Sequence, residues 1–300
     1  MKELKGGKSI ILGDRTVIEK KKDRKLEYFG RGKKGKELWI YTFGIPFKGR
    51  VLPIQTELYA PEPLRRNETH QNLIERLIEK VGEEIVIVFD AELTYEAILK
   101  ELKGAGISYV VPLKREVILI DPETGERYSL RELKEKVYQR GVTKWSKELL
   151  YKGEERVKVV VHKIPFPKGR GERVGILIAS LDLEDEEVIR AYRERMKIEE
   201  TFRDWKSYNG VEKLMFRKRE ILEKVLLVLM VAYTLFTLFG EMLKEKVILN
   251  PLERRKKSGY FLVKFEFHRF VNLLSDAVWK AFIWEVLRPC KLNVTFCDST

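Results

Sequence analysis

The stretch EEIVIVFDAEL, residues 83–93, constrains the fold of this chain most strongly. Its apolar run has the length of a strand, and continuous apolarity is typical of a strand that is buried on both faces. Such strands belong to α/β architectures, which present functional groups at the carboxyl ends of their strands. Asp90 stands at that end, and a helix pattern with a glycine stop follows over residues 94–106. Thr94 is better placed than Asp90 to cap this helix, so the pattern makes Asp90 a candidate site residue.

A second acid lies in a strand pattern near the amino terminus. Residues 8–18, KSIILGDRTVI, are rich in β-branched residues and contain Asp14 as their only acid. A carboxylate in a core strand is costly unless it is paired or binds a metal ion, which makes Asp14 a second candidate. The alternative is an aspartate at a strand end, in a turn with Gly13.

The order of the remaining patterns predicts an α/β fold. A hairpin and a helix precede the strand of Asp90, and two strands separated by a β-rich stretch with a basic helix follow it. In chain order these patterns cover residues 38–59, 64–80, 107–115, 116–173 and 174–181.

Residues 185–208, DEEVIRAYRERMKIEETFRDWKSY, contain no Pro or Gly and predict one helix. At about 100° per residue, one carboxylate, three cations and a phenol fall on a narrow stripe of this helix. Cations bind phosphates, and a carboxylate among them is useful if it holds a metal ion that phosphate oxygens also contact. The stripe therefore suits a polyanionic substrate, although its i,i+4 pairs also fit a solvated surface. Its members are Tyr192, Arg195, Glu199, Arg203 and Lys206.

The charge balance favours an anionic partner. The formal net charge is +13, which suits nucleic acid or an anionic membrane surface. The apolar run 225–240 is shorter than the roughly 18 residues of a membrane span and is bracketed by charges, so it predicts a buried helix and no membrane partner. With no secretory signal, and with Cys290 and Cys297 typical of free intracellular thiols, we expect a cytoplasmic, nucleoid-associated protein.

The spacing of Tyr192, Arg195, Glu199 and Lys206 resembles the Tyr-Arg-Glu-Lys signature of DDE transposases from prokaryotic insertion sequences. Asp14, followed two residues later by Thr16, and Asp90 are similar in their settings to the first two acids of that family. The resemblance covers roughly residues 8–243. It implies an RNase H-like fold, with a mixed five-stranded sheet flanked by helices and a β-rich insertion before the last catalytic helix.

This resemblance implies metal-dependent DNA strand cleavage and strand transfer. Asp14, Asp90 and Glu199 would be the catalytic residues and the ligands of two Mg²⁺ or Mn²⁺ ions, since carboxylates favour these ions. The expected partners are double-stranded DNA, as transposon ends and as target, and a second copy in a homodimer. The expected DNA contacts are Tyr192, Arg195, Arg203, Lys206, Lys114 and Arg115, with solvated loop charges as the alternative for the last two.

Three features depart from the family pattern. Ala91 and Glu92 follow Asp90 where the family often has Arg or Gly, and Met196 stands where some relatives have Trp. Relatives usually carry a sizeable region before the first acid, whereas Asp14 lies thirteen residues from Met1. Two alternatives therefore stay open: a truncated or degenerate transposase that binds DNA without catalysis, and a stand-alone RNase H-like nuclease.

The patterns divide the chain into four parts. Residues 1–115 and 174–243 form the two parts of the core, and residues 116–173 form the insertion. Residues 244–300 form a basic and aromatic helical region. Its pattern fits either contact with DNA or a terminal helix that packs on the rest of the chain.

Overall fold

The computed structural model divides the chain into two compact units, Met1–Met230 and Val231–Thr300. Of the second unit, only residues 231–246 are described, as the continuation of one helix. The described residues are 7–20, 29–31, 36–60, 66–82, 84–93, 96–113, 117–138, 141–165, 172–214, 216 and 218–246.

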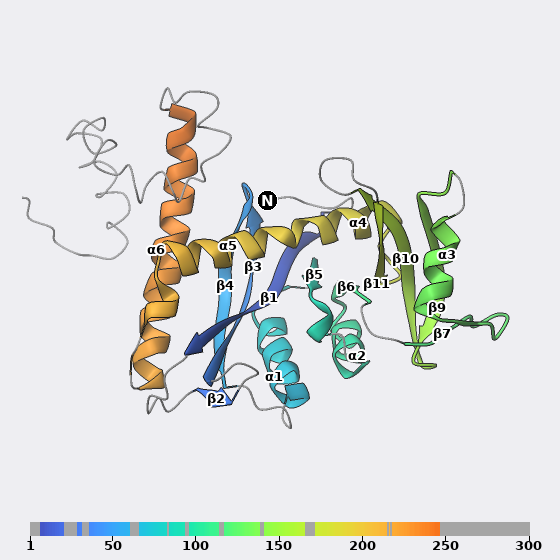
Figure 1. Ribbon diagram of the computed structural model, residues 1–300, viewed down its shortest axis with the longest axis horizontal. Helices are drawn as coiled ribbons and strands as arrows, with labels where there is room; N and C mark the ends of the chain where they lie inside the picture. The colour runs from blue at the N-terminus through green and yellow to red at the C-terminus, as the bar shows by residue number, and fades with distance from the viewer. Residues whose placement is uncertain are drawn as a thin grey trace, which may run out of the picture. The chain divides into compact units, whose positions relative to one another are not determined.

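The centre of the first unit is a mixed sheet of five strands in the order β4-β3-β1-β5-β6 (Figure 1). β1 pairs in parallel with β5, and β5 with β6, whereas β3 runs antiparallel to both β1 and β4. This arrangement confirms the expected RNase H-like mixed sheet. The strands are β1 (Ser9–Lys20), β3 (Lys36–Phe47), β4 (Arg50–Tyr59), β5 (Ile85–Phe89) and β6 (Ser108–Pro112).

The predicted hairpin is β3 and β4, joined by Lys48 and Gly49. Both residues have positive φ, 44° and 83°, as a two-residue hairpin turn that matches the twist of the strands requires. A two-residue strand, β2 (Gly30–Arg31), pairs with the start of β3.

The β-rich stretch extends the central sheet. β11 (Glu172–Ala179) pairs antiparallel with β6, and β10 and β9 follow it in the same sheet. Two short strands complete the described sheet beyond β9. The strands of this stretch are β7 (Leu119–Ile120), β8 (Arg127–Tyr128), β9 (Lys144–Tyr151) and β10 (Glu155–Pro165). The boundaries 116–173 stay a prediction.

Helices lie against both faces of the sheet. Side chains of the first three helices share one core with alternate residues of the strands, such as Ile11 and Ile87. The residues between them, such as Leu12 and Val88, point to the other face and are also buried. On that face α4 and α5 run end to end across the strands (Figure 1). The helices are α1 (Arg66–Ile78), α2 (Glu96–Gly104), α3 (Leu130–Tyr138), α4 (Asp185–Glu194), α5 (Met196–Ser207) and α6 (Arg219–Lys246).

Two sequence predictions about helices are wrong. Residues 185–208 form two helices that meet at Arg195 instead of one. The apolar run 225–240 is part of α6, which has 28 residues, and this helix is not buried on all sides, since Leu227 and Val228 are exposed. By length and composition, its span Arg219–Glu241 is long and apolar enough to cross a membrane, a property that core helices of soluble proteins share.

Candidate active site

Asp14 and Asp90 occupy matching positions on neighbouring parallel strands. The pairing of β1 with β5 runs from Ser9 beside Ile85 to Gly13 beside Phe89. The next residue on each strand is the acid, and side chains at matching positions of parallel strands point to the same face. The two carboxylates are close enough that the charge of Asp90 raises the pKa of Asp14. The fold thus brings together two acids that lie 76 positions apart in the sequence.

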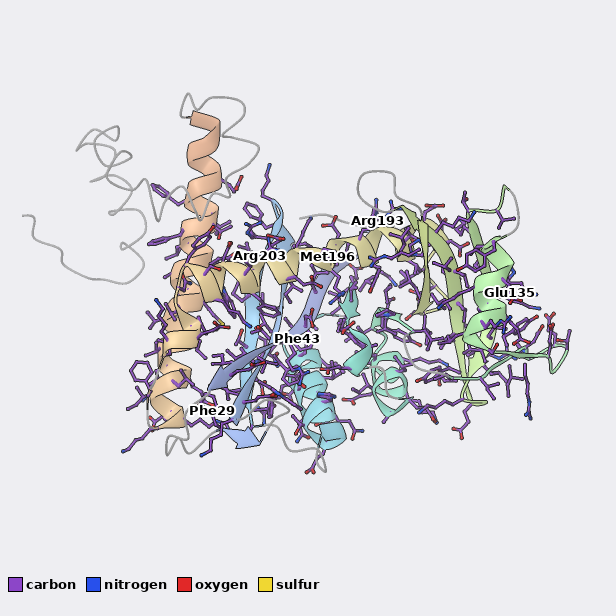
Figure 2. The ribbon with its side chains drawn as sticks, in the orientation of Figure 1. Phe29, Phe43, Glu135, Arg193, Met196 and Arg203 are labelled. Atoms are coloured by element: carbon purple, nitrogen blue, oxygen red, sulfur yellow. The ribbon has the colours of Figure 1, made fainter. Side chains whose placement is uncertain are left out.

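Gly13 makes room beneath Asp14. A Cβ atom at position 13 would lie 2.2 Å from Cε1 of Phe43, a distance that real side chains do not adopt. Phe43 is a buried residue of β3, and its label lies over β1 in Figure 2. The glycine before Asp14 is therefore required by packing.

The chain passes from α4 to α5 at Arg195, and this junction aims Arg195 at the sheet. The Arg195 N–H bonds the Tyr192 carbonyl, and the Ile198 N–H bonds the Arg195 carbonyl, so the turn tightens to a three-residue spacing. The backbone keeps helical angles there, φ −54° and ψ −35°. The two helices consequently continue in one direction, with Arg193, Met196 and Arg203 along their length (Figure 2).

Arg195 joins Asp14 to Glu199. Its Nη1 atom lies 2.6 Å from Oδ2 of Asp14, and its Nη2 atom lies 2.9 Å from Oε1 of Glu199. The second oxygen of Asp14 accepts a hydrogen bond of 2.7 Å from the Arg15 amide. The arginine side chain is 10% exposed and that of Asp14 14%, whereas that of Glu199 is 43% exposed. A buried guanidinium thus holds the β1 acid and the α5 acid on either side of itself.

The protonation of this cluster follows from burial and from its neighbours. Burial raises the pKa of Asp14 to about 6, with Arg195 lowering it and the charges of Asp90 and Glu199 raising it. Burial lowers the pKa of Arg195, but Asp14, Tyr192, Asp90 and Glu199 raise it above its usual value. The guanidinium therefore stays charged, and the Asp14 carboxyl gains a proton more readily than an exposed aspartate.

The far side of α5 anchors the helix that carries Glu199. Thr201 Oγ1 accepts a hydrogen bond of 2.8 Å from the amide of Val51 on β4. Arg50 Nε lies 2.6 Å from Oδ2 of Asp204, whose side chain is 2% exposed. Sequence reasoning missed these contacts, because Thr201 and Asp204 look like ordinary helix residues until β4 is placed beside them.

The other members of the stripe have different environments. The ring of Tyr192 lies 5.7 Å from the Arg195 guanidinium. Lys206 Nζ donates to the Val17 carbonyl at 2.9 Å and lies 3.3 Å from Glu212, so its ammonium is tied to β1. Arg203 is exposed and pairs with Glu200 at 2.8 Å. Lys114 and Arg115 lie outside the described residues.

Within the described ranges, no three His, Cys, Asp or Glu side chains are arranged so that they could hold a metal ion. At the candidate site, the Arg195 guanidinium contacts two of the acids instead. Three carboxylates are nevertheless the donor chemistry that suits Mg²⁺ or Mn²⁺, and two of them already bind the Arg195 cation.

A family model described as transposase DDE domain matches residues 5–235. The chain belongs to this transposase family. DDE transposases generally use divalent metal ions, which agrees with the carboxylate set. The family match leaves open whether this transposase belongs to the Tyr-Arg-Glu-Lys group, and that signature stays a prediction.

The transposase chain is also similar to a piggyBac transposase, seen by cryo-EM in a synaptic complex with hairpin DNA. The similarity has a TM-score of 0.47 and 12% sequence identity, and covers 97% of this chain and 60% of that chain. Our chain thus corresponds to somewhat less than two thirds of that transposase. No curated protein matches the chain.

Proposed function

We propose that the chain is the catalytic core of a DNA transposase that cleaves and joins DNA strands with Asp14, Asp90 and Glu199. The observation that carries the proposal is the juxtaposition of Asp14 and Asp90 at matching strand positions, with Glu199 joined to Asp14 through Arg195. Membership of the DDE transposase family supports it, since three acids in this order give the family its name.

Asp14, Asp90 and Glu199 would hold two Mg²⁺ or Mn²⁺ ions. When bound, such ions activate the attacking oxygen and stabilise the leaving oxygen of a phosphodiester. Bound cations would also relieve the repulsion among the acids: burial is the main cause that raises the pKa of Asp14, and the charges of Asp90 and Glu199 raise it further. Asp14 would be the central one of the three ligands, because Asp90 occupies the matching position on the neighbouring strand and Arg195 joins Asp14 to Glu199.

In the proposed reaction, water attacks phosphorus and the bond to the 3′ oxygen breaks, which leaves a 3′ hydroxyl. That hydroxyl then attacks a phosphodiester of the target, and a 3′ oxygen of the target strand leaves. The chain's own residues bind and orient the DNA during both steps. No covalent bond to the protein forms.

Arg195 would exchange its carboxylate partners for a phosphate of the bound strand, since its forked donors suit phosphate oxygens as well as carboxylates. Tyr192 would contact the backbone beside it. Arg203 is exposed and available to DNA after leaving Glu200. Lys206 would reach a flanking phosphate by leaving Val17, and Lys114 and Arg115 complete the proposed DNA contacts.

The proposed partners are the ends of an insertion sequence and its target, bound by a homodimer that is associated with the nucleoid. The net charge of +13 supports a polyanionic partner. Two DNA ends must be cut and joined together, which two copies of one catalytic core accomplish.

The test uses a labelled duplex made from the DNA that flanks the coding sequence of the chain, with Mg²⁺ or Mn²⁺. We expect the wild type to cut this duplex and to join the new 3′ end to a second DNA, and Asp90→Asn to bind the duplex without cutting it. Cutting without joining would identify a stand-alone nuclease. Binding with neither reaction would identify a degenerate transposase and contradict the proposal.

A further inference from the structure

An ion pair joins the two residues that flank the candidate acids. Arg15 follows Asp14 directly, and Glu92 lies two positions after Asp90. Nη2 of Arg15 lies 2.7 Å from Oε1 of Glu92. The Arg15 guanidinium also lies 4.1 Å from the centre of the Trp39 ring on β3. Three segments distant in sequence therefore meet around one guanidinium.

This ion pair lies where the backbone no longer holds the two acids together. The pairing of β1 with β5 ends at Gly13 beside Phe89, one residue before each acid. Glu92 belongs to the short 3₁₀ turn Ala91–Leu93 that follows Asp90. The Arg15–Glu92 contact thus ties β1 to the segment after Asp90 at the point where the ladder stops.

Arg15 is also tied to the carboxylate of Asp14. Its backbone amide donates a hydrogen bond of 2.7 Å to Oδ1 of that acid. Because successive side chains of a strand point to opposite faces, the Arg15 guanidinium lies on the face opposite Asp14. The side chain therefore does not reach the reacting phosphate, and its effect on the site passes through the backbone.

The surroundings make this pair stronger than a surface ion pair. The side chains of Arg15 and Glu92 are 18% and 34% exposed, so solvent screens them only in part. Trp39 is itself held by a hydrogen bond of 3.2 Å from its Nε1 atom to Glu37. A guanidinium that is stacked on a fixed ring loses less freedom when it binds a carboxylate.

We propose that Arg15, Trp39 and Glu92 form a positioning clamp that sets the separation of Asp14 and Asp90 for metal binding. This proposal rests on the proposed function, in which Asp14 and Asp90 bind the same metal ions.

The test measures binding of Mn²⁺ to the full chain by titration calorimetry, together with the Mg²⁺ concentration that gives half-maximal DNA cleavage. The variants are Glu92→Gln, Arg15→Gln and the charge exchange of Arg15→Glu with Glu92→Arg. The matched control is Arg76→Gln, because Arg76 pairs with Glu57 at the same 2.7 Å distance on a different part of the sheet. Trp39→Phe is a milder variant that keeps the ion pair, and thermal unfolding checks that each variant folds.

Both single variants of the pair should bind Mn²⁺ about tenfold more weakly, as loss of contacts that orient metal ligands typically does. Their half-maximal Mg²⁺ concentration should rise by a similar factor, while saturating metal restores the cleavage rate. The charge exchange should recover most of the affinity, Trp39→Phe should lose less than Glu92→Gln, and Arg76→Gln should match the wild type.

Wild-type Mn²⁺ affinity in Glu92→Gln and Arg15→Gln would overturn the clamp, as would a charge exchange no better than the single variants. An equal loss in Arg76→Gln would also overturn it, because the effect would then be general destabilisation. If the wild type itself neither binds Mn²⁺ nor cuts DNA, the proposed function fails. If the wild type binds Mn²⁺ and cuts DNA, and the variants bind Mn²⁺ equally well, only the clamp is contradicted and the proposed function stands.

Discussion

Nη1 of Arg195 lies 2.6 Å from Oδ2 of Asp14, although the two residues are 181 positions apart in the chain. The same guanidinium contacts Glu199, so one buried cation balances two of the three candidate acids. A metal ion at these acids has to compete with this cation. DNA phosphate, by drawing Arg195 away, would favour metal binding, and binding of DNA and of metal would then support each other.

Arg195→Gln should destabilise the metal-free protein by about 3 kcal/mol, because the variant leaves the buried carboxylate of Asp14 without its cation. Mn²⁺ should stabilise this variant more than it stabilises the wild type, since the competing charge is gone. Urea unfolding with a chelator and with Mn²⁺ measures both effects. Arg203→Gln, which removes an exposed arginine of α5, is the control. An equal loss with and without Mn²⁺ would contradict the competition.

Asp204→Asn should destabilise the protein by about 2 kcal/mol, because Arg50 loses the charge of a carboxylate that is 2% exposed. The cost is below that of a fully buried pair, since the Arg50 side chain is 19% exposed. Arg203→Gln removes an exposed pair and should change stability by no more than about 0.5 kcal/mol. Chemical denaturation of both variants measures the difference, and similar small losses would show that Asp204 does not anchor α5.

Gly13→Ala should destabilise the protein by about 1–3 kcal/mol, because the added methyl group would overlap the Phe43 ring. A second substitution, Phe43→Leu, should make the alanine less costly than it is in the wild-type background. The four proteins of this double-mutant cycle are compared by thermal unfolding. Additive losses would mean that the ring moves aside freely and that position 13 needs no glycine.

His162 should lower the stability of the protein as the pH falls from about 7 to about 5, whereas Asp14, whose pKa burial raises to about 6, acts in the opposite direction. The His162 ring is 4% exposed. Burial is the main cause that lowers its pKa; the backbone of Lys163 raises it, Arg193 and Arg173 lower it further, and Glu186 raises it slightly. The unfolded chain therefore takes up the proton first as the pH falls, which favours unfolding below the ordinary histidine pKa.

His162→Phe keeps a ring and removes the titrating nitrogens. Urea unfolding at several pH values should show that this variant gains stability relative to the wild type as the pH falls from about 7 to about 5. Parallel curves for the two proteins would mean that His162 takes up its proton equally in both states.

The fold could be predicted because its signals are local. The continuous apolar run before Asp90, the Lys48–Gly49 turn and the spacing of strands and helices each specify one element, and their order specifies the mixed sheet. The α6 prediction failed for a physical reason. An apolar run favours burial of a helix. Where the helix ends, and whether residues such as Leu227 and Val228 are covered, depends on the rest of the fold.

The candidate acids could be named from sequence, but their connections could not. Asp14, Asp90 and Glu199 were found by burial cost and by resemblance. The break at Arg195 was missed, because a run of good helix formers carries no sign that one side chain will turn toward a strand 181 positions away. Arg15 and Glu92 were missed as partners, although Glu92 was visible as a departure from the family pattern.

The most direct test of the central claim compares Glu199→Gln with Glu200→Gln in metal-dependent cleavage of the flanking DNA duplex. The two neighbours are both carboxylates of α5, but Glu199 contacts Arg195 at the candidate site and Glu200 pairs with Arg203. We expect Glu199→Gln to lose cleavage by about 100-fold or more while it still binds DNA, and Glu200→Gln to cut within about threefold of the wild type. Equal activity of the two variants would contradict the assignment of Glu199, and with it the proposed triad.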